Sequence, residues 1–169
     1  TSVSQLVAHA KAQPGKLSFA SAGIGAGAHL AAELLKHMAR IDVVHIPYKG
    51  SGPAMTDLMA GQVAYMFAGI SAAYPHTVSG KLRALAVSTA KRSASAPEIP
   101  TVAESGLPGY QTNTWNSLVV PRGTPAPIIQ RLNTEVVGIL NEPEVKERLK
   151  QQAIDPDPGT PAQLAAHIK

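Results

Sequence analysis

The chain has 169 residues, of which 44% are hydrophobic and 15% charged, a balance typical of a globular protein with a packed core. Its formal net charge is +4, but no block of basic residues is interleaved with aromatic ones, so nucleic acid is not an expected partner. Cysteine is absent, which excludes a thiol nucleophile, a cysteine-ligated metal and a disulfide framework.

The first half of the chain alternates short apolar runs with amphipathic segments. A serine, Ser2 or Ser4, can cap a first helix that ends at Pro14 and Gly15. Leucine and methionine then recur at four-residue spacing over 27–40, which predicts a second helix with one buried stripe, Leu30, Leu34 and Met38. Two further helices are predicted, one with Pro53 at its first position and one after Ser71, and strands are predicted over 17–20, 42–47, 63–67 and 82–88.

This alternation of strands and helices predicts an α/β fold with a mostly parallel sheet. Ligands of such sheets lie at the carboxyl ends of the strands. Three of the predicted strands end in loops rich in glycine or serine, and we expect these loops to converge on one edge of the sheet: 21–27, 48–52 and 69–71.

The stretch 16–29, KLSFASAGIGAGAH, is the strongest candidate for a binding site. Three glycines, Gly23, Gly25 and Gly27, stand between a predicted strand and a predicted helix, so the main chain can turn tightly and a ligand can approach it. The helix directs its free N–H groups and the positive end of its dipole at this turn. The pattern therefore predicts a site for a carboxylate or a phosphate.

Two other interpretations fit the same stretch. The sequence 23–28 matches the G-x-G-x-x-A form of the dinucleotide fingerprint, which would make the chain a fragment of a nucleotide-dependent, Rossmann-like enzyme. That interpretation requires an acidic residue at the end of the next strand, whereas Asp42 opens that strand. In the second interpretation, the glycines serve only close packing of a helix on a strand.

Single side chains near these loops are further candidates. His29 lies in the first turn of the second helix, where a histidine can contact an anion or, more commonly, orient a loop. His37 shares its helix, but two histidines without a carboxylate do not predict a metal site. Tyr48 and Lys49 can present a donor and a positive charge to a carboxylate, although a lone loop lysine is often only solvated. No catalytic residue and no cofactor are expected.

The pattern changes after Lys91, where a proline-rich link precedes a mainly helical part of the chain, residues 114–169. An extended stretch over 110–120 holds the only tryptophan, Trp115, and an amphipathic helix begins after Thr124. Its apolar positions form a stripe, Ile128, Ile129, Leu132, Val136 and Leu140. Three capping boxes are predicted, at Thr101–Glu104, Asn141–Glu144 and Thr160–Gln163, and Glu144 and Arg148 are spaced for an ion pair.

Five segments together resemble the periplasmic solute-binding receptors of tripartite tricarboxylate transporters, the Bug-type family. In chain order they are KLSFASAGIGAGAHLAAE at 16–33, VHIPYKGSGPAMTDLMAGQV at 44–63, GKLRALAVSTAKR at 80–92, PEIPTVAESGLPGY at 97–110 and WNSLVVPRGTPAPIIQRLN at 115–133. The resemblance covers nearly the whole chain, and the order and spacing of the segments agree with it.

The resemblance implies a two-lobed, class II periplasmic-binding-protein fold. Residues 1–112 would form the second lobe, and residues 113–169 the crossover strand and helices of the first lobe, whose N-terminal part and export signal are missing. Such a receptor captures a small carboxylate, either a dicarboxylate, an aromatic acid or an acidic amino acid, without chemistry. It passes this solute to membrane permease subunits, so a periplasmic location is implied.

The resemblance and the glycine-rich turn together predict the ligand-binding residues: Ser21, Ala22, Gly23, Gly25, Ala26, Gly27, His29, Tyr48, Lys49, Gly50, Gly69, Ser71, Trp115 and Asn116. One departure stands at Ala26, where the family commonly has a serine or threonine hydroxyl, so one side-chain donor is lost. Because the helices after Thr124 carry apolar stripes that expect a missing lobe, we expect this chain alone to associate or to swap these helices with another copy.

Overall fold

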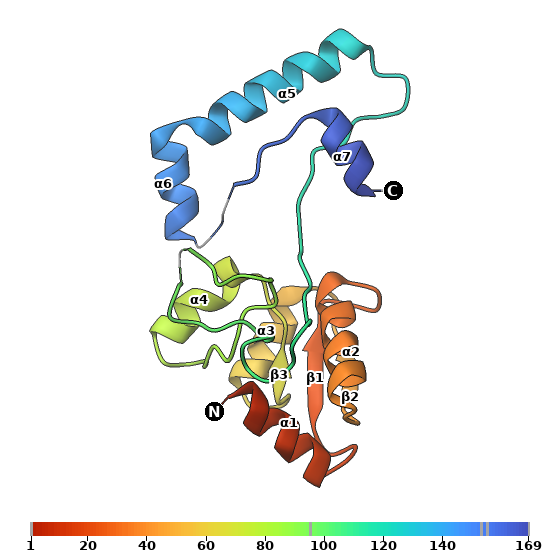
Figure 1. Cartoon of the computed structure of the whole chain (residues 1–169), viewed down its shortest axis with the longest axis vertical. Helices are drawn as coiled ribbons and strands as arrows, with labels where there is room; N and C mark the ends of the chain where they lie inside the picture. Colours follow the sequence, from red (N-terminus) through yellow and green to blue (C-terminus); the bar gives the residue numbers. More distant parts are fainter. Residues whose placement is uncertain (1, 95, 153, 155, 169) are drawn as a thin grey trace. The chain divides into compact units, whose positions relative to one another are not determined.

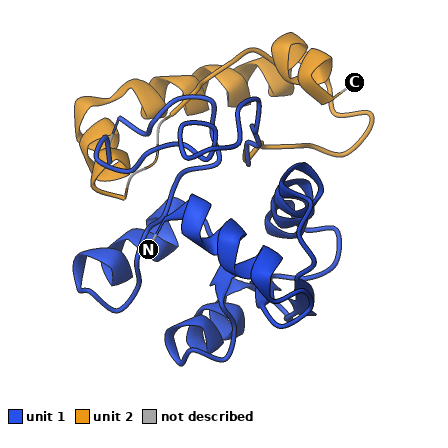
Figure 2. Cartoon of the chain, turned by 60° about the horizontal axis from the view of Figure 1, so that its bottom comes forward, with its two compact units in different colours: residues 1–114 blue, residues 115–169 orange. Residues whose placement is uncertain are grey.

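The computed structural model describes residues 2–94, 96–152, 154 and 156–168 (Figure 1). The chain divides into two compact units, Thr1–Thr114 and Trp115–Lys169, which are called unit 1 and unit 2 below (Figure 2). None of the helices in the described part of the chain is long and apolar enough to span a membrane.

Unit 1 is an α/β structure around a small parallel sheet. Its elements follow in the order α1 (Val3–Ala12), β1 (Ser18–Ser21), α2 (Gly27–Ala39), β2 (Val44–Pro47), α3 (Ser51–Met59), β3 (Tyr65–Met66) and α4 (Ile70–Val78). The strand order is β2-β1-β3, with β1 in the middle (Figure 1). Both neighbours run parallel to β1, and Phe19 pairs with His45 on one side and Tyr65 on the other. The predicted parallel sheet and three of its strands are therefore confirmed.

Helices cover both faces of the sheet because successive strand residues point to opposite sides. Phe19 points into the larger core cluster, which includes Ala10 of α1 and Leu35 of α2. Ala20 points the other way and packs with Ala54 of α3. The sheet is thus held between α1 and α2 on one face and α3 on the other, and its carboxyl edge is left for loops.

The prediction of a fourth strand over 82–88 is wrong. This segment forms only an isolated bridge between Val87 and Thr101, and the Val87 amide donates to the Pro100 carbonyl at 2.8 Å. Leu85 and Ala86 nevertheless pack against the larger core cluster. The apolar pattern of the segment therefore reflects burial against the core, while its backbone hydrogen bonds go to loops instead of a neighbouring strand.

The buried stripe predicted on α2 is only partly confirmed, since Leu34 and Met38 pack against the larger core cluster but Leu30 does not. Leu30 is 59% exposed, and Leu34 and Met38 are only partly buried. The buried face consists of Leu35 and three alanines, Ala31, Ala32 and Ala39. Small side chains let the helix lie close to the sheet, so the fully buried contact is made mainly by alanines, which the sequence pattern did not assign to it. Likewise, α3 begins at Ser51, so Pro53 is not its first residue.

Unit 2 contains α5 (Ala126–Asn141), α6 (Pro143–Gln151) and α7 (Pro161–Ile168). The capping box at Thr160 is confirmed, since the Thr160 amide donates to Gln163 at 2.7 Å and the Gln163 amide donates to the Thr160 hydroxyl at 3.2 Å. The ion pair between Arg148 and Glu144 is confirmed at 2.7 Å. The box predicted at Asn141 is wrong, because Asn141 ends α5 and its side-chain amide donates to the Val137 carbonyl.

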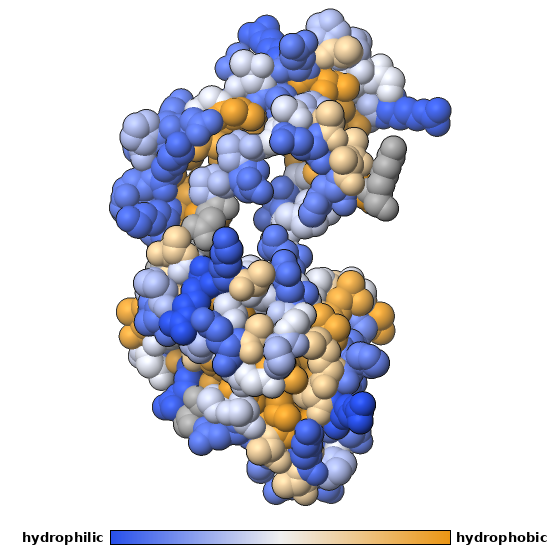
Figure 3. Space-filling view, viewed as in Figure 1, coloured by the Kyte–Doolittle hydropathy of each residue, from blue (hydrophilic) through white to orange (hydrophobic). Residues whose placement is uncertain are grey.

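No residue in the described part of unit 2 is buried. The stripe on α5 keeps large apolar side chains at the surface, and apolar surface lies among hydrophilic residues there (Figure 3). Ile128 of this stripe and Ile139, elsewhere on α5, are each 50% exposed. Unit 2 therefore has no hydrophobic core of its own in its described residues.

Candidate functional site

The loops that leave β1 and β2 join at the carboxyl edge of the sheet. The Tyr48 amide donates to the Ser21 carbonyl, and the Gly50 amide donates to the Ala22 carbonyl, each at 3.0 Å. We call the segment 21–29 the glycine corner. Within the described residues, no hydrogen bond joins Gly69 or Ser71 to this corner; Gly69 instead precedes α4 and its carbonyl accepts from Ala72 and Ala73.

Glycine is required in the corner for conformation more than for space. Gly25 has a φ of +80°, which other residues rarely adopt, and a Cβ placed there would meet nothing within 4 Å. At Gly27, in contrast, a Cβ would lie 3.3 Å from the Thr114 hydroxyl oxygen. The interpretation that the glycines serve packing alone therefore fits Gly27 but does not fit Gly25.

The corner keeps some amides occupied and leaves others free. The Gly23 amide donates to the Ser21 hydroxyl, the Gly25 amide to Nδ1 of His29, and the Ala26 amide to the Gly23 carbonyl. These three amides were expected to face a ligand and instead have internal partners. Among the described residues, four other amides have none: Ala22, Ile24, Gly27 and Ala28.

The free amides arise at the start of α2. Ala26 is the N-cap residue, and alanine offers no side-chain oxygen to the first turn. Gly27 and Ala28 therefore present N–H groups at the positive end of the helix dipole, a suitable partner for an anion. Ile24 and Ala28 were missed in the sequence; the missing cap at Ala26 is the signal that points to Ala28.

The His29 ring of the glycine corner belongs to a stack of rings. The His29 ring stacks on His45 at 4.2 Å between centroids, and His45 stacks on Phe19 at 4.7 Å. Nε2 of His45 lies 2.7 Å from the hydroxyl of Ser21, which is fully buried. Burial, followed by the neighbouring His29, lowers the pKa of His45 below its usual value. His45 was missed, although a histidine in the apolar run VVHIP was a visible signal.

Tyr48 and Lys49 differ in their surroundings. The Tyr48 hydroxyl donates to Oδ2 of Asp57 at 2.7 Å, and this hydrogen bond raises the tyrosine pKa above its ordinary value. Lys49 is exposed, and within the described residues it forms no ion pair. Lys49 is therefore available as a positive charge beside the corner, whereas the Tyr48 hydroxyl is already engaged.

The geometry does not support a nucleotide site. Asp42 precedes β2 and its carbonyl accepts from the Gly15 amide, which precedes β1, so Asp42 lies at the edge of the sheet opposite the corner. Asp42 is therefore not placed to hold a ribose next to the glycines. Across the described ranges, no group of three or more metal-ligating side chains is present.

The remaining predicted residues belong to unit 2. Trp115 and Asn116 are its first two residues, and within unit 2 the Trp115 ring contacts His167 edge to face at 5.2 Å.

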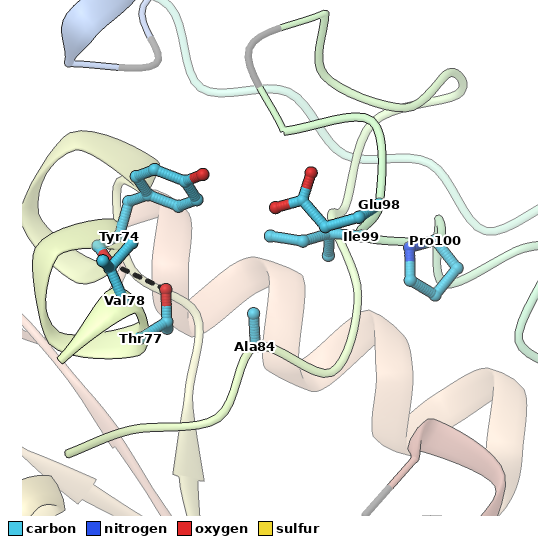
Figure 4. Close-up of a pocket in the computed structure, with 7 residues that line it drawn as sticks. All are labelled: Tyr74, Thr77, Val78, Ala84, Glu98, Ile99 and Pro100. Carbon is cyan, nitrogen blue, oxygen red and sulfur yellow. Dashed lines mark hydrogen bonds between the residues drawn. The ribbon is translucent and has the colours of Figure 1, made fainter. Parts of the chain in front are cut away.

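A separate cavity of about 290 Å³ lies in unit 1 between α4 and the irregular segment that follows it (Figure 4). It contains no residue of the glycine corner; its lining is Tyr74, Thr77, Val78, Ala84, Glu98, Ile99 and Pro100.

Comparison with known sequences identifies a family for the whole chain. Residues 1–169 match the model of the tripartite tricarboxylate transporter family receptor. The chain is 42% identical over 168 residues to the "UPF0065 protein in tcbD-tcbE intergenic region" of Pseudomonas sp. (strain P51). It is 38% identical over 167 residues to "Protein BugT" of Bordetella pertussis (strain Tohama I). It covers 50% and 51% of these relatives, so the chain spans about half their length.

Solved structures show the same fold. The structure titled "R. palustris Rpa4515 with adipate" superposes with a TM-score of 0.95 at 36% identity, over 99% of this chain and 56% of that one. "MatC (Rpa3494) from Rhodopseudomonas palustris with bound malate" gives 0.90 at 33% identity, over 99% and 58%. "Structure of periplasmic binding protein BugD" gives 0.82 at 36% identity, over 90% and 51%. The expected α/β fold of a periplasmic binding protein is confirmed for this chain.

Proposed function

We propose, because this chain belongs to the tripartite tricarboxylate transporter receptor family, that it supplies part of a receptor that captures a small organic carboxylate without chemical change. The observation that carries the proposal is the pair of free amides at Gly27 and Ala28, at the start of a helix with no side-chain cap. Two relatives of known structure are titled with adipate and with malate, which are both dicarboxylates.

The carboxylate would accept hydrogen bonds from main-chain donors of the glycine corner. Gly27 and Ala28 lie at the positive end of α2, and Ala22 and Ile24 add free amides on the approach to it. Charge-assisted hydrogen bonds of this kind contribute about 1.5–3 kcal/mol each. Lys49 would add long-range attraction for an anion, and Tyr48 and Gly50 would flank the site.

The two units would belong to different lobes of the receptor. Unit 1 would be the second lobe, and Trp115 and Asn116 would lie near the hinge. Unit 2 would pack on the first lobe, because its described residues include none that is buried and its apolar stripe needs a partner. Gly69 and Ser71, at the third strand end, would close the floor of the cleft after lobe movement.

The wider role proposed here is inferred from the family. The receptor would work in the periplasm and pass its solute to membrane permease subunits. We place no catalytic residue in it, since the donors that the corner offers to a ligand are backbone amides. The solute would be a dicarboxylate, an aromatic acid or an acidic amino acid.

Calorimetry with matched variants at one position tests this function. Gly27→Pro removes a single N–H, and its backbone fits, because Pro suits the first helical position and Ala26 has the extended conformation that precedes proline, φ −63° and ψ 152°. Gly27→Ala keeps the N–H and introduces the same Cβ beside Thr114. Adipate, malate and an aromatic acid are titrated into the chain and into both variants.

We expect at least one of these acids to bind, and Gly27→Pro to weaken that binding roughly tenfold, as the loss of one charge-assisted hydrogen bond predicts. Gly27→Ala should stay within about threefold of the unmodified chain. Equal losses in the two variants would assign the effect to the Cβ and remove the role of the amide. No binding to any acid in the panel would contradict the proposed function.

A further inference from the structure

One amide of the glycine corner is held by a group that can change its protonation state. The Gly25 N–H donates to Nδ1 of His29 at 3.1 Å. Because Nδ1 accepts this bond, it carries no proton, and the His29 ring is neutral with its proton on Nε2. The site described above thus has an occupied donor whose partner is titratable.

The neighbouring histidine is fixed by a different hydrogen-bond pattern. The Ser21 hydroxyl donates to the Gly23 carbonyl at 3.0 Å and accepts from the Gly23 amide at 3.2 Å. Its single proton is thereby used, so Nε2 of His45, at 2.7 Å, must donate to it. His45 keeps this bond in either protonation state, whereas His29 must lose its bond to Gly25 on accepting a proton at Nδ1.

We propose that His29 is a proton-controlled positioning residue: when protonated, it releases the Gly25 amide, and both this N–H and Nδ1–H of His29 become donors for a bound carboxylate. The inference rests on the proposed carboxylate function of the corner and adds its regulation. His45 is the neutral ring on which His29 stacks, and it holds the corner through Ser21 while His29 changes state.

The charged and titratable groups around His29 and His45 favour a protonated His29 beside a neutral His45. From α2, Glu33 lies 4.0 Å from Nε2 of His29 and can balance its charge, and Lys36 is itself paired to Glu33 at 2.8 Å. From β2, the pKa of His45 is lowered by burial and by His29, so the His45 ring keeps its neutral form to lower pH. From β3, Tyr65 stacks on Phe19, and burial raises its hydroxyl pKa well above the usual value.

The expected direction of the pH effect follows from charge. Without an anion, a proton on His29 is opposed by the positive end of α2, whereas a bound carboxylate favours it. The anion therefore favours the protonated form of His29. Affinity for the anion should therefore increase as pH falls. We expect adipate to bind about five- to tenfold more tightly at pH 6.5 than at pH 8.5.

The first test needs no ligand and uses ¹⁵N NMR of the full chain between pH 8.5 and pH 5.5. The Gly25 amide resonance should move with the same midpoint as the His29 ring nitrogens. His29→Asn keeps an acceptor oxygen near the position of Nδ1 and cannot titrate, so its Gly25 amide should be independent of pH. The matched control His37→Asn changes an exposed histidine of the same helix and should leave the coupling intact. A Gly25 amide that stays constant while the His29 ring titrates would overturn the inference.

The second test adds adipate to the same samples. Movement of the Gly27 and Ala28 amides together with a raised His29 midpoint supports both the function and its regulation. Movement of these amides with an unchanged midpoint overturns the linkage and leaves the function standing. If the two amides do not respond, adipate binding at the corner fails, and the ligand-free titration still decides whether His29 controls Gly25. All of these readings come from the unmodified chain, so they do not depend on a variant that folds.

Discussion

At the scale of single residues, two buried tyrosines in unit 1 have opposite hydrogen-bond situations. Tyr110 donates from its hydroxyl to the Ala31 carbonyl at 2.8 Å, whereas the Tyr65 hydroxyl is buried and has no partner among the described residues. Burial raises the pKa of Tyr110 to about 12 and also raises that of Tyr65, so both remain neutral at ordinary pH. Replacing each tyrosine in turn therefore compares a buried hydroxyl without a partner with a buried hydroxyl that forms a hydrogen bond.

We expect the two phenylalanine variants to change stability in opposite directions. Tyr65→Phe removes an unsatisfied buried hydroxyl and should raise the free energy of unfolding by about 1 kcal/mol. Tyr110→Phe removes a satisfied hydrogen bond and should lower it by about 1 kcal/mol. Urea unfolding of both variants beside the unmodified chain measures this difference. Equal destabilisation by both changes would show that the Tyr65 hydroxyl is satisfied in solution.

The free donors of the corner are also a residue-scale feature that the sequence only partly predicted. The glycine pattern located the turn correctly, but it could not distinguish occupied amides from free ones. That distinction depends on Ser21 and His29, whose side chains reach back to Gly23 and Gly25. Such contacts depend on rotamers and on the neighbouring strand, and no spacing rule contains them.

At the scale of elements, strongly periodic segments were predicted well and contact faces were not. β1, β2 and α2 follow from β-branched or alternating runs and a glycine turn, and each lies close to its expected range. The strand predicted over 82–88 is wrong because an apolar run indicates only that a segment is buried. It does not show whether a neighbouring strand pairs with that segment. The fully buried face of α2 was not predicted, because alanine contributes little to a hydrophobic pattern although it permits the closest packing.

The capping box at Thr101 shows a local motif without its helix. The Thr101 amide donates to Oε2 of Glu104 at 2.7 Å, and the Glu104 amide donates to the Thr101 hydroxyl at 3.0 Å. The residues form turns instead of an α-helix. The hydrogen bond from the Thr101 amide, followed by that from Arg92, lowers the pKa of Glu104. The motif is thus stabilised by the charged form of one carboxylate.

This arrangement predicts a pH dependence of stability. Since the folded-state pKa of Glu104 is lowered, its contribution is present above the unfolded-state pKa and is lost as pH falls through the folded value. Glu104→Gln should therefore reduce the loss of stability between about pH 5 and pH 3. Thermal unfolding at a series of pH values measures the effect. Glu98→Gln, a nearby exposed acid, is the control and should leave the profile unchanged. Identical profiles for Glu104→Gln and the unmodified chain would contradict the account of the motif.

At the scale of the whole molecule, the two units differ in how well they can support themselves. Unit 1 has two core clusters on opposite faces of its sheet, and unit 2 has no buried residue in its described part. The sequence predicted a mainly helical part over 114–169, from its amphipathic and capping patterns, and the boundary between the units lies after Thr114. The apolar stripe of α5 was also predicted from its periodicity, but its exposure could be seen only in the structure.

We expect the chain to self-associate in solution through this stripe. Leu132→Glu places a charge within the stripe and should shift the chain toward a monomer, because the charge would have to be buried on association. Gln130→Glu adds the same charge at another exposed position of α5 and should not. Light scattering over a range of protein concentrations measures both. A monodisperse monomer for the unmodified chain at all concentrations would contradict the expectation.

Backbone amides of the glycine corner are proposed to bind a small carboxylate, and ¹⁵N NMR with adipate and malate tests this binding most directly. The prediction is a saturable downfield movement of the Gly27 and Ala28 amide protons, with smaller changes at Ala22 and Ile24 and none at exposed amides of α5. The contradictory result is saturable binding of either acid that leaves the Gly27 and Ala28 amides unmoved, or no response of these amides at any concentration of either acid.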